Sequence, residues 1–160
     1  MCLSQVEEEL VSATQRSQVT DTPDRVVVTI PGLRIRNGCN LREHWSVRAK
    51  RVKRERFLVG AALWKLGRAR PELSNRDPRV AWRYAPALWN LGPTPVIVTL
   101  TRCAGRLLDD DNAIAGFKGV RDEVADWLGV DDRDPRVTWR YAQERSKGYA
   151  VRIEIDARTM

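Results

Sequence analysis

One segment constrains the fold more than any other, because it joins a strand pattern, an acidic cluster and a helix pattern without a break. Residues 95–102 (PVIVTLTR) are rich in β-branched side chains, which predicts a buried strand. Three aspartates follow, Asp109 to Asp111, and then a helical pattern over about residues 112–128. Gly129 is a typical residue just past a helix end. A strand that leads directly into a helix indicates an α/β fold.

The other regular segments agree with this fold class. Residues 25–33 (RVVVTIPGL) predict a strand and a turn. A helix is expected over about residues 46–66, capped by Ser46 and closed by Gly67. Two runs around Ser146 and Gly148, RVTWRYAQ and YAVRIEID, predict a terminal β-hairpin. We therefore expect a small mixed β-sheet packed with two main α-helices.

The length of 160 residues suits a single domain with one core. Residues 1–24 are polar and acidic, and we expect them to form a mobile extension to a domain over residues 25–160. Residues 68–92 are rich in proline, which suggests an insertion. This segment holds RDPRVAWRYA (76–85), which differs at one position from RDPRVTWRYA (133–142). A local duplication explains the match better than a repeat architecture.

Charge is distributed unevenly along the chain. The net charge is +7, but residues 1–24 contain five acids and one base, so the remainder carries +11. Nine acidic residues fall between Asp109 and Asp134, and we call this stretch the acidic island. A basic body points to a polyanionic partner, most often nucleic acid. The alternative is a soluble protein with a high isoelectric point and no such partner.

Several classes of protein fit the chain poorly. No apolar run is long enough to span a bilayer, and the first residues lack the pattern of a secretory signal, so we expect no membrane association. Three cysteines, Cys2, Cys39 and Cys103, are odd in number and far apart, which favours a reducing, cytoplasmic compartment. With one histidine, His44, a tetrahedral zinc site is also a poor fit.

The acidic island is a candidate metal site. If Asp109 and Asp111 end an extended segment, their side chains project to the same side. Asp131 and Asp132 return after the helix and are placed to close the cluster. Clustered carboxylates suit Mg²⁺, or alternatively Mn²⁺, with phosphate oxygens as further ligands. The competing interpretation is that the aspartates only cap a helix.

The helix within the acidic island has two distinct faces. The predicted core stripe consists of Ile114, Phe117, Val124 and Leu128, with Val120 or Arg121 between them. The other face consists of Asp111, Ala115, Lys118 and Asp122. A helical lysine leans toward the N-terminus, so Lys118 is expected to approach a phosphate held at the metal. Alternatively, Lys118 and Asp122 form only a solvated pair.

The helix over residues 46–66 and the turn before it carry many bases, opposed only by Glu43 and Glu55. The candidate DNA-binding residues are Arg42, Arg48, Lys50, Arg51, Lys53 and Arg54. Because the apolar stripe must face the core, most of these bases are expected to face solvent and to contact phosphates. A solvated basic face without a ligand is the alternative.

The acidic island resembles the signature of the RusA-like Holliday junction resolvases, a family often carried by prophages. Asp109 to Asn112 match its Asp-x-Asp-Asn motif at a helix start, and Asp131-Asp132 match its later Asp-Asp. The turn from Asn40 to Trp45, followed by a basic helix, is also similar. The resemblance covers roughly residues 25–156, although only the acidic island is specific.

The resemblance implies metal binding by Asp109, Asp111 and Asp132, and a catalytic role for Lys118. Asp122 matches the aspartate one turn further, and Asn112 and Asp131 are expected to support the ligands. The chain departs from the family in one respect, because the lysine of the founding member aligns with Ala115.

The expected activity is a Mg²⁺-dependent endodeoxyribonuclease that resolves four-way junctions in DNA recombination and repair, as a homodimer with two sites for two symmetric cuts. Two alternatives remain open at this stage. One is a nuclease for flaps or other branched or single-stranded DNA. The other is a non-catalytic, basic DNA-binding protein.

Overall fold

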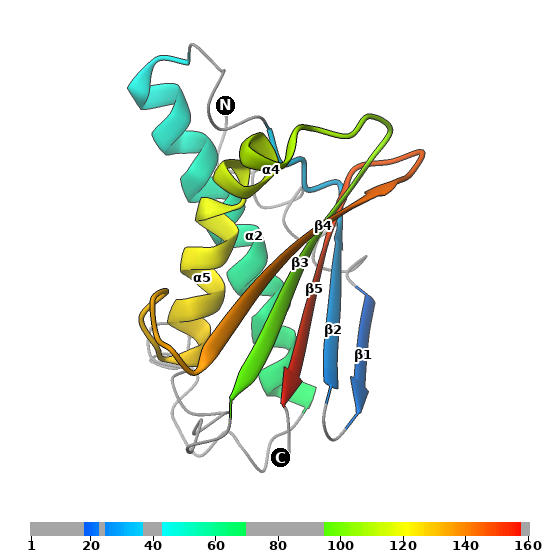
Figure 1. Cartoon of the computed structure of the whole chain (residues 1–160), viewed down its shortest axis with the longest axis vertical. Coiled ribbons are helices and arrows are strands. Elements are labelled where there is room, and N and C mark those ends of the chain that lie inside the picture. The colour runs from blue at the N-terminus through cyan, green and yellow to red at the C-terminus, as the bar shows by residue number, and fades with distance from the viewer. Residues whose placement is uncertain (1–17, 23–24, 37–42, 70–94, 158–160) are drawn as a thin grey trace.

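The computed structural model describes residues 18–22, 25–36, 43–69 and 95–157. Five strands form one sheet, and the helices lie together on one of its faces (Figure 1). The strands are β1 (Gln18–Thr22), β2 (Arg25–Pro31), β3 (Val96–Ala104), β4 (Val137–Arg145) and β5 (Ala150–Ala157). The helices are α2 (Trp45–Ala69), α4 (Asp110–Gly116) and α5 (Lys118–Leu128). The expected mixed sheet with two main helices is confirmed, with α4 as a short third helix.

The strand order is β1-β2-β5-β3-β4, and it corrects one prediction. The two last strands were expected to pair as a hairpin, but β3 lies between them. β3 pairs in parallel with β4 and antiparallel with β5. β3 is the most buried strand, with only Thr99 partly exposed, and it lies inside the sheet between β5 and the edge strand β4. The link from β4 to β5 therefore passes the end of β3, where Ser146 N donates to Ala104 O at 3.1 Å.

The core lies between the sheet and the helices. Alternate residues of β2 and β5 are buried, as expected for strands with one face on the core. Phe117 is fully buried, and its ring centroid lies 5.9 Å from that of Tyr141 on β4. From α2, the core receives Val59, Ala62 and Leu63. The helix face that carries these residues thus fixes which side of α2 meets the sheet.

α2 begins one residue before the predicted cap. The carbonyl of His44 accepts from the amides of Val47 and Arg48, and Ser46 lies inside the first turn. The predicted cap at Ser46 is therefore wrong. The imidazole Nδ1 of His44 lies 2.8 Å from Ser46 Oγ, so the His44 side chain, just before the helix, contacts a residue of the first turn of α2. The helix also continues through Gly67 to Ala69, because an isolated glycine weakens a helix without ending it.

The single helix predicted over residues 112–128 is two helices that meet at Phe117. Phe117 has φ −79° and ψ −3°, and its amide is shared between the carbonyls of Ala113 and Ile114. The break turns Ile114 out of the core, where it is 43% exposed, so its place in the predicted stripe is wrong. Of the two options for the middle of the stripe, Val120 is fully buried, whereas Arg121 is only partly buried. α5 ends at Gly129, which has φ +69°, as predicted.

β1 was not predicted. It pairs antiparallel with β2 from Gln18↔Thr29 to Thr22↔Arg25, so five residues of the expected mobile extension belong to the sheet. Residues 1–17 lie outside the described part of the chain, as do residues 70–92 of the expected insertion, the first copy of the repeat and Arg42. Among the described helices, none is long and apolar enough to cross a membrane.

Candidate functional site

The three adjacent aspartates lie where β3 leads into α4. Asp109 is the extended residue before the helix, and Asp110 and Asp111 form its first turn, where carboxylates interact favourably with the helix dipole. The extended segment was expected to reach Asp111, but it ends at Asp109. All three side chains are exposed, and within the described residues no basic side chain forms an ion pair with them. Among the described residues, no cation of the chain therefore offsets their mutual repulsion, which solvent screens.

Asn112 connects this cluster to the core. It is 8% exposed, and its Nδ2 lies 3.4 Å from Asp109 Oδ2, a long hydrogen bond. The resemblance implies a supporting role for Asn112, which stays a prediction. The structure shows that its buried amide donates to Asp109, which restrains that carboxylate.

The backbone just before Asp109 is held by Gln143 of β4. Gln143 Nε2 donates to Leu108 O at 2.7 Å, and Leu108 N donates to Gln143 Oε1 at 2.8 Å. Arg102, which is 6% exposed, donates to Ile35 O at 3.2 Å and to Arg106 O at 2.7 Å. Burial lowers the pKa of Arg102 below its ordinary value. These contacts fix the loop between β3 and α4 to the sheet.

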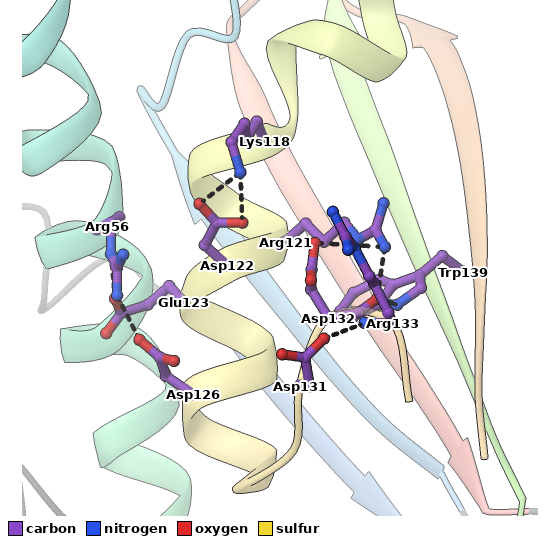
Figure 2. A network of polar contacts seen from close by, with 10 residues as sticks. All are labelled: Arg56, Lys118, Arg121, Asp122, Glu123, Asp126, Asp131, Asp132, Arg133 and Trp139. Atoms are coloured by element: carbon purple, nitrogen blue, oxygen red, sulfur yellow. Dashed lines mark hydrogen bonds and ion pairs between the residues drawn. The ribbon is translucent and has the colours of Figure 1, made fainter. Parts of the chain in front are cut away.

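Asp132 is held by a different set of contacts (Figure 2). Its carbonyl accepts from Arg121 Nη2 and, at 3.0 Å, from Trp139 Nε1. Its carboxylate lies 3.4 Å from Arg121 Nη2. The guanidinium of Arg121 also lies 5.2 Å from the ring centroid of Trp139. The Asp132 carboxylate is therefore already paired with a cation of its own chain.

The two other carboxylates of this loop, Asp131 and Asp134, accept hydrogen bonds from backbone amides two residues later. Asp131 Oδ1 accepts from the amide of Arg133 at 2.9 Å. Asp134 accepts from the amide of Arg136 at 2.9 Å and from its guanidinium at 2.6 Å. These hydrogen bonds from Arg136 lower the pKa of Asp134 to about 2.

Lys118 lies at the start of α5, with its ammonium on Asp122. Nζ is 3.2 Å from each carboxylate oxygen of Asp122 (Figure 2). The Lys118 ammonium was expected to lean toward Asp111, but it contacts the carboxylate of Asp122 instead, one turn further along α5. Lys118 is 70% exposed, so this pair contributes little to stability. Its charge remains accessible from solvent.

The fit of these residues to a divalent ion is partial. The chemistry of Asp109 and Asp111 suits Mg²⁺, which is commonly bound by one or two carboxylates together with water and substrate phosphates. The part of the chain that the structure describes contains no group of three or more metal-ligating side chains. Asp132 lies beside Trp139, whereas the loop before Asp109 is held by Gln143, four residues or about 13 Å further along β4. The expectation that Asp131 and Asp132 close the cluster of Asp109 and Asp111 is therefore wrong.

α2 presents most of its bases to solvent, as predicted. Arg48, Lys50, Lys53 and Arg54 are exposed. Arg51 is different, because its side chain is 16% exposed and bonds Glu43 at 3.2 Å and Glu55 at 2.9 Å. The expectation that Arg51 belongs to the exposed basic surface is therefore wrong. Lys50, Lys53 and Arg54 project from one side of the helix, and we call them the basic face of α2, whereas Arg48 projects from the side that carries Glu55 and Val59.

Arg56, five residues after Arg51, is also paired with carboxylates of the chain. It bonds Glu123 at 2.9 Å and also pairs with Asp126, which links α2 to α5 (Figure 2). Burial raises the pKa of Glu123, partly offset by Arg56. Arg51 and Arg56 are thus engaged by carboxylates of the chain, whereas the side chains of Arg48, Lys50 and Lys53 are exposed.

Sequence reasoning missed the two residues of β4 that hold the acidic loops. Trp139 and Gln143 are four apart on the strand and therefore share a face, which is also the face of Tyr141. Trp139 contacts the loop of Asp132, and Gln143 contacts the loop before Asp109. The one signal in the sequence was that Gln143 shares a strand face with Trp139 and Tyr141. This pattern alone does not identify the loops that these side chains contact.

Comparison with known proteins adds little to these observations. No family model matches the chain. An uncharacterized protein from Xylella fastidiosa is 37% identical over 98 residues, which cover 59% of this chain and 52% of that protein. The chain therefore matches about half the length of this relative. The cell wall anchor of the type VI secretion system from Pseudomonas aeruginosa covers 98% of each chain at 18% identity, with a TM-score of 0.37.

Proposed function

We propose that this protein is a Mg²⁺-dependent endonuclease of the RusA-like type that resolves four-way DNA junctions. The observation that carries the proposal is the acidic cluster of Asp109, Asp110 and Asp111. These exposed carboxylates have no ion pair within the described residues, in a chain whose net charge is +7. Adjacent carboxylates that no protein cation neutralises suit a bound divalent cation.

The basic face of α2 supports the choice of substrate. Arg48, an exposed base on the other side of α2, lines a cavity together with Ala115, which belongs to the same short helix as Asp111. We expect the basic face to make most phosphate contacts, with Arg48 nearest the acidic cluster. Such contacts bind DNA arms without reading their sequence, as a structure-selective enzyme requires.

In the proposed mechanism, Asp109 and Asp111 hold the ion. Bound Mg²⁺ would supply Lewis-acid chemistry toward a phosphodiester. Asn112 and Gln143 restrain Asp109 and its loop, so the carboxylate is oriented before substrate binds. Lys118, which is 70% exposed, can exchange Asp122 for a phosphate oxygen and stabilise its negative charge.

Two further parts of the proposal concern assembly and compartment. Two symmetric cuts need two sites, so we propose a homodimer whose two-fold axis matches that of the junction. Because the substrate is DNA undergoing recombination or repair, we propose that the protein acts in the cytoplasm.

One observation favours a second candidate, a DNA-binding protein without catalysis. Arg121 and Trp139 hold Asp132, so the third carboxylate implied by the resemblance is engaged elsewhere. In this alternative the aspartates only begin α4, and the basic face of α2 binds branched DNA.

Labelled four-way junctions, flaps and linear duplexes, each with and without Mg²⁺, separate the candidates. A resolvase gives paired symmetric nicks in the junction only with Mg²⁺. Cutting of flaps in preference to junctions would indicate a nuclease for other branched DNA. Tight junction binding without any product would favour the non-catalytic alternative.

A further inference from the structure

A cavity of about 150 Å³ lies between α2 and the pair of helices α4 and α5. Its walls include the small or apolar residues Val52, Ala115, Gly116 and Gly119. Arg48 and Lys118 also line it, and both are exposed. An apolar cavity with a few charged groups is typical of a site for a small ligand.

Glu55 is the unusual residue of this cavity. It is 3% exposed, and its Oε1 accepts from Arg51 at 2.9 Å. Its Oε2 is buried and has no hydrogen-bond partner. Burial raises the pKa of Glu55 above its ordinary value, although Arg51 opposes this. A buried acceptor without a partner costs free energy, so it gains when a ligand supplies a donor.

Gly119 leaves space beside this oxygen. A Cβ at Gly119 would lie 3.3 Å from Glu55 Oε2 and 3.2 Å from Val52 Cγ1, closer than side chains usually pack. Glycine here therefore keeps the space next to the unpaired oxygen free of side-chain atoms.

The lining of the cavity carries a net positive charge, because it contains three bases and two carboxylates: Arg48, Arg51, Lys118, Glu55 and Asp122. Arg48 has no acidic partner among the residues that the structure describes. Lys118 is paired with Asp122 in an exposed contact, which a phosphate can replace at little cost. The ligand should thus combine an N–H donor for Glu55, flat apolar faces for the walls, and a phosphate for Arg48 and Lys118.

We propose that this cavity is a subsite for one unpaired nucleotide of the bound DNA. The base enters between α2 and α5 and donates an N–H to Glu55 Oε2, while its phosphate lies at Arg48 and Lys118. A phosphodiester group of DNA has no donor for Glu55, whereas every base has an N–H on its pairing edge. The subsite rests on the proposed function and deepens it, because it would hold a nucleotide that has become unpaired at the branch point of the bound DNA.

The test is an NMR titration of the isotope-labelled protein without Mg²⁺, so that cleavage plays no part. The probes are the four deoxynucleoside monophosphates and, separately, inorganic phosphate. We expect at least one nucleotide to shift the amide signals of Gly116 and Gly119 saturably. We also expect it to bind about tenfold more tightly than inorganic phosphate, the gain from one hydrogen bond to a charged group.

Glu55→Gln removes the charged acceptor and keeps the shape of the side chain, so nucleotide affinity should fall about tenfold. Glu123→Gln is the matched control, because Glu123 is another carboxylate between α2 and α5 and does not line the cavity. Its nucleotide affinity should equal that of the wild type. If Glu55→Gln does not fold, Ala115→Met fills the cavity and should abolish the shifts.

Two results would overturn the subsite. Equal affinity for phosphate and for every nucleotide, unchanged in Glu55→Gln, would exclude recognition of a base. The absence of any saturable shift would exclude the site altogether. Either result leaves Mg²⁺-dependent cleavage untouched, and a failure of cleavage leaves nucleotide binding measurable, so the two proposals fail separately.

Discussion

Gln143→Met tests whether β4 positions the acidic cluster. Methionine matches glutamine in length but makes no hydrogen bonds of comparable strength. The variant therefore removes both bonds to Leu108, of 2.7 and 2.8 Å, without leaving a large cavity. The loop that leads to Asp109 then loses its fixed link to the sheet.

The expected magnitude follows from these two bonds. A neutral hydrogen bond contributes about 1 kcal/mol net, so the free energy of unfolding should fall by about 2 kcal/mol. For a chain of this size, that corresponds to a melting temperature lower by about 6 °C. If the loop orients Asp109 toward a metal ion, Mn²⁺ affinity should also fall by about 10-fold to 100-fold, as for other residues that support metal ligands.

Denaturant unfolding measures the first quantity, and Mn²⁺ titration followed by electron paramagnetic resonance measures the second. Arg145→Met is the control, because Arg145 is exposed at the end of the same strand. Its stability should stay within about 0.5 kcal/mol of the wild type. A Gln143→Met protein as stable as this control, with unchanged Mn²⁺ affinity, would refute the role of Gln143.

Three further outcomes are expected. Phe117→Ala should lower the free energy of unfolding by about 3–5 kcal/mol in urea titration, because the fully buried ring leaves a cavity beside Tyr141. Asp134 has a pKa of about 2 against an ordinary 3.8, so its pair with Arg136 stabilises the fold above pH 4 and is lost as the pH falls toward 2. The stability difference between wild type and Asp134→Asn should therefore shrink between pH 4 and pH 2, and a constant difference would contradict this. Lys53→Ala should weaken DNA binding and reduce the slope of log affinity against log salt by about 0.9 if Lys53 contacts one phosphate, as measured by fluorescence anisotropy.

The elements that local patterns determine were predicted well. The buried run of β3 and the C-terminal glycine of α5 depend on residues close together in the chain. The pairing of β4 with β3 instead of β5 depends on which strand lies inside the sheet next to β5, and that is decided by burial across the whole sheet. β1 escaped prediction because the short sequence QVTDT has no strong strand pattern and acquires its structure from pairing with β2.

The candidate site was predictable in its residue types more than in its contacts. The exposed carboxylates of Asp109 and Asp111 follow from the sequence, as do most of the bases on α2. The engagement of Asp132 by Arg121 joins residues eleven positions apart that meet only in the folded chain. Arg51 and Glu55 are i,i+4 neighbours on α2, so that pair could have been read from the sequence. Glu55 also falls on the apolar side of α2, where a periodicity argument expects a hydrophobic residue.

The most direct test of the proposed function is the cleavage rate of a synthetic four-way junction in Mg²⁺ by the wild type, Asp111→Asn and Asp126→Asn. Asp126 lies on α5, is exposed and pairs with Arg56, so its substitution makes the same change of charge away from the acidic cluster. The account predicts paired symmetric nicks by the wild type and Asp126→Asn, and a rate at least about 100-fold lower for Asp111→Asn. Cleavage by Asp111→Asn at the wild-type rate, or no cleavage by any of the three, would contradict it.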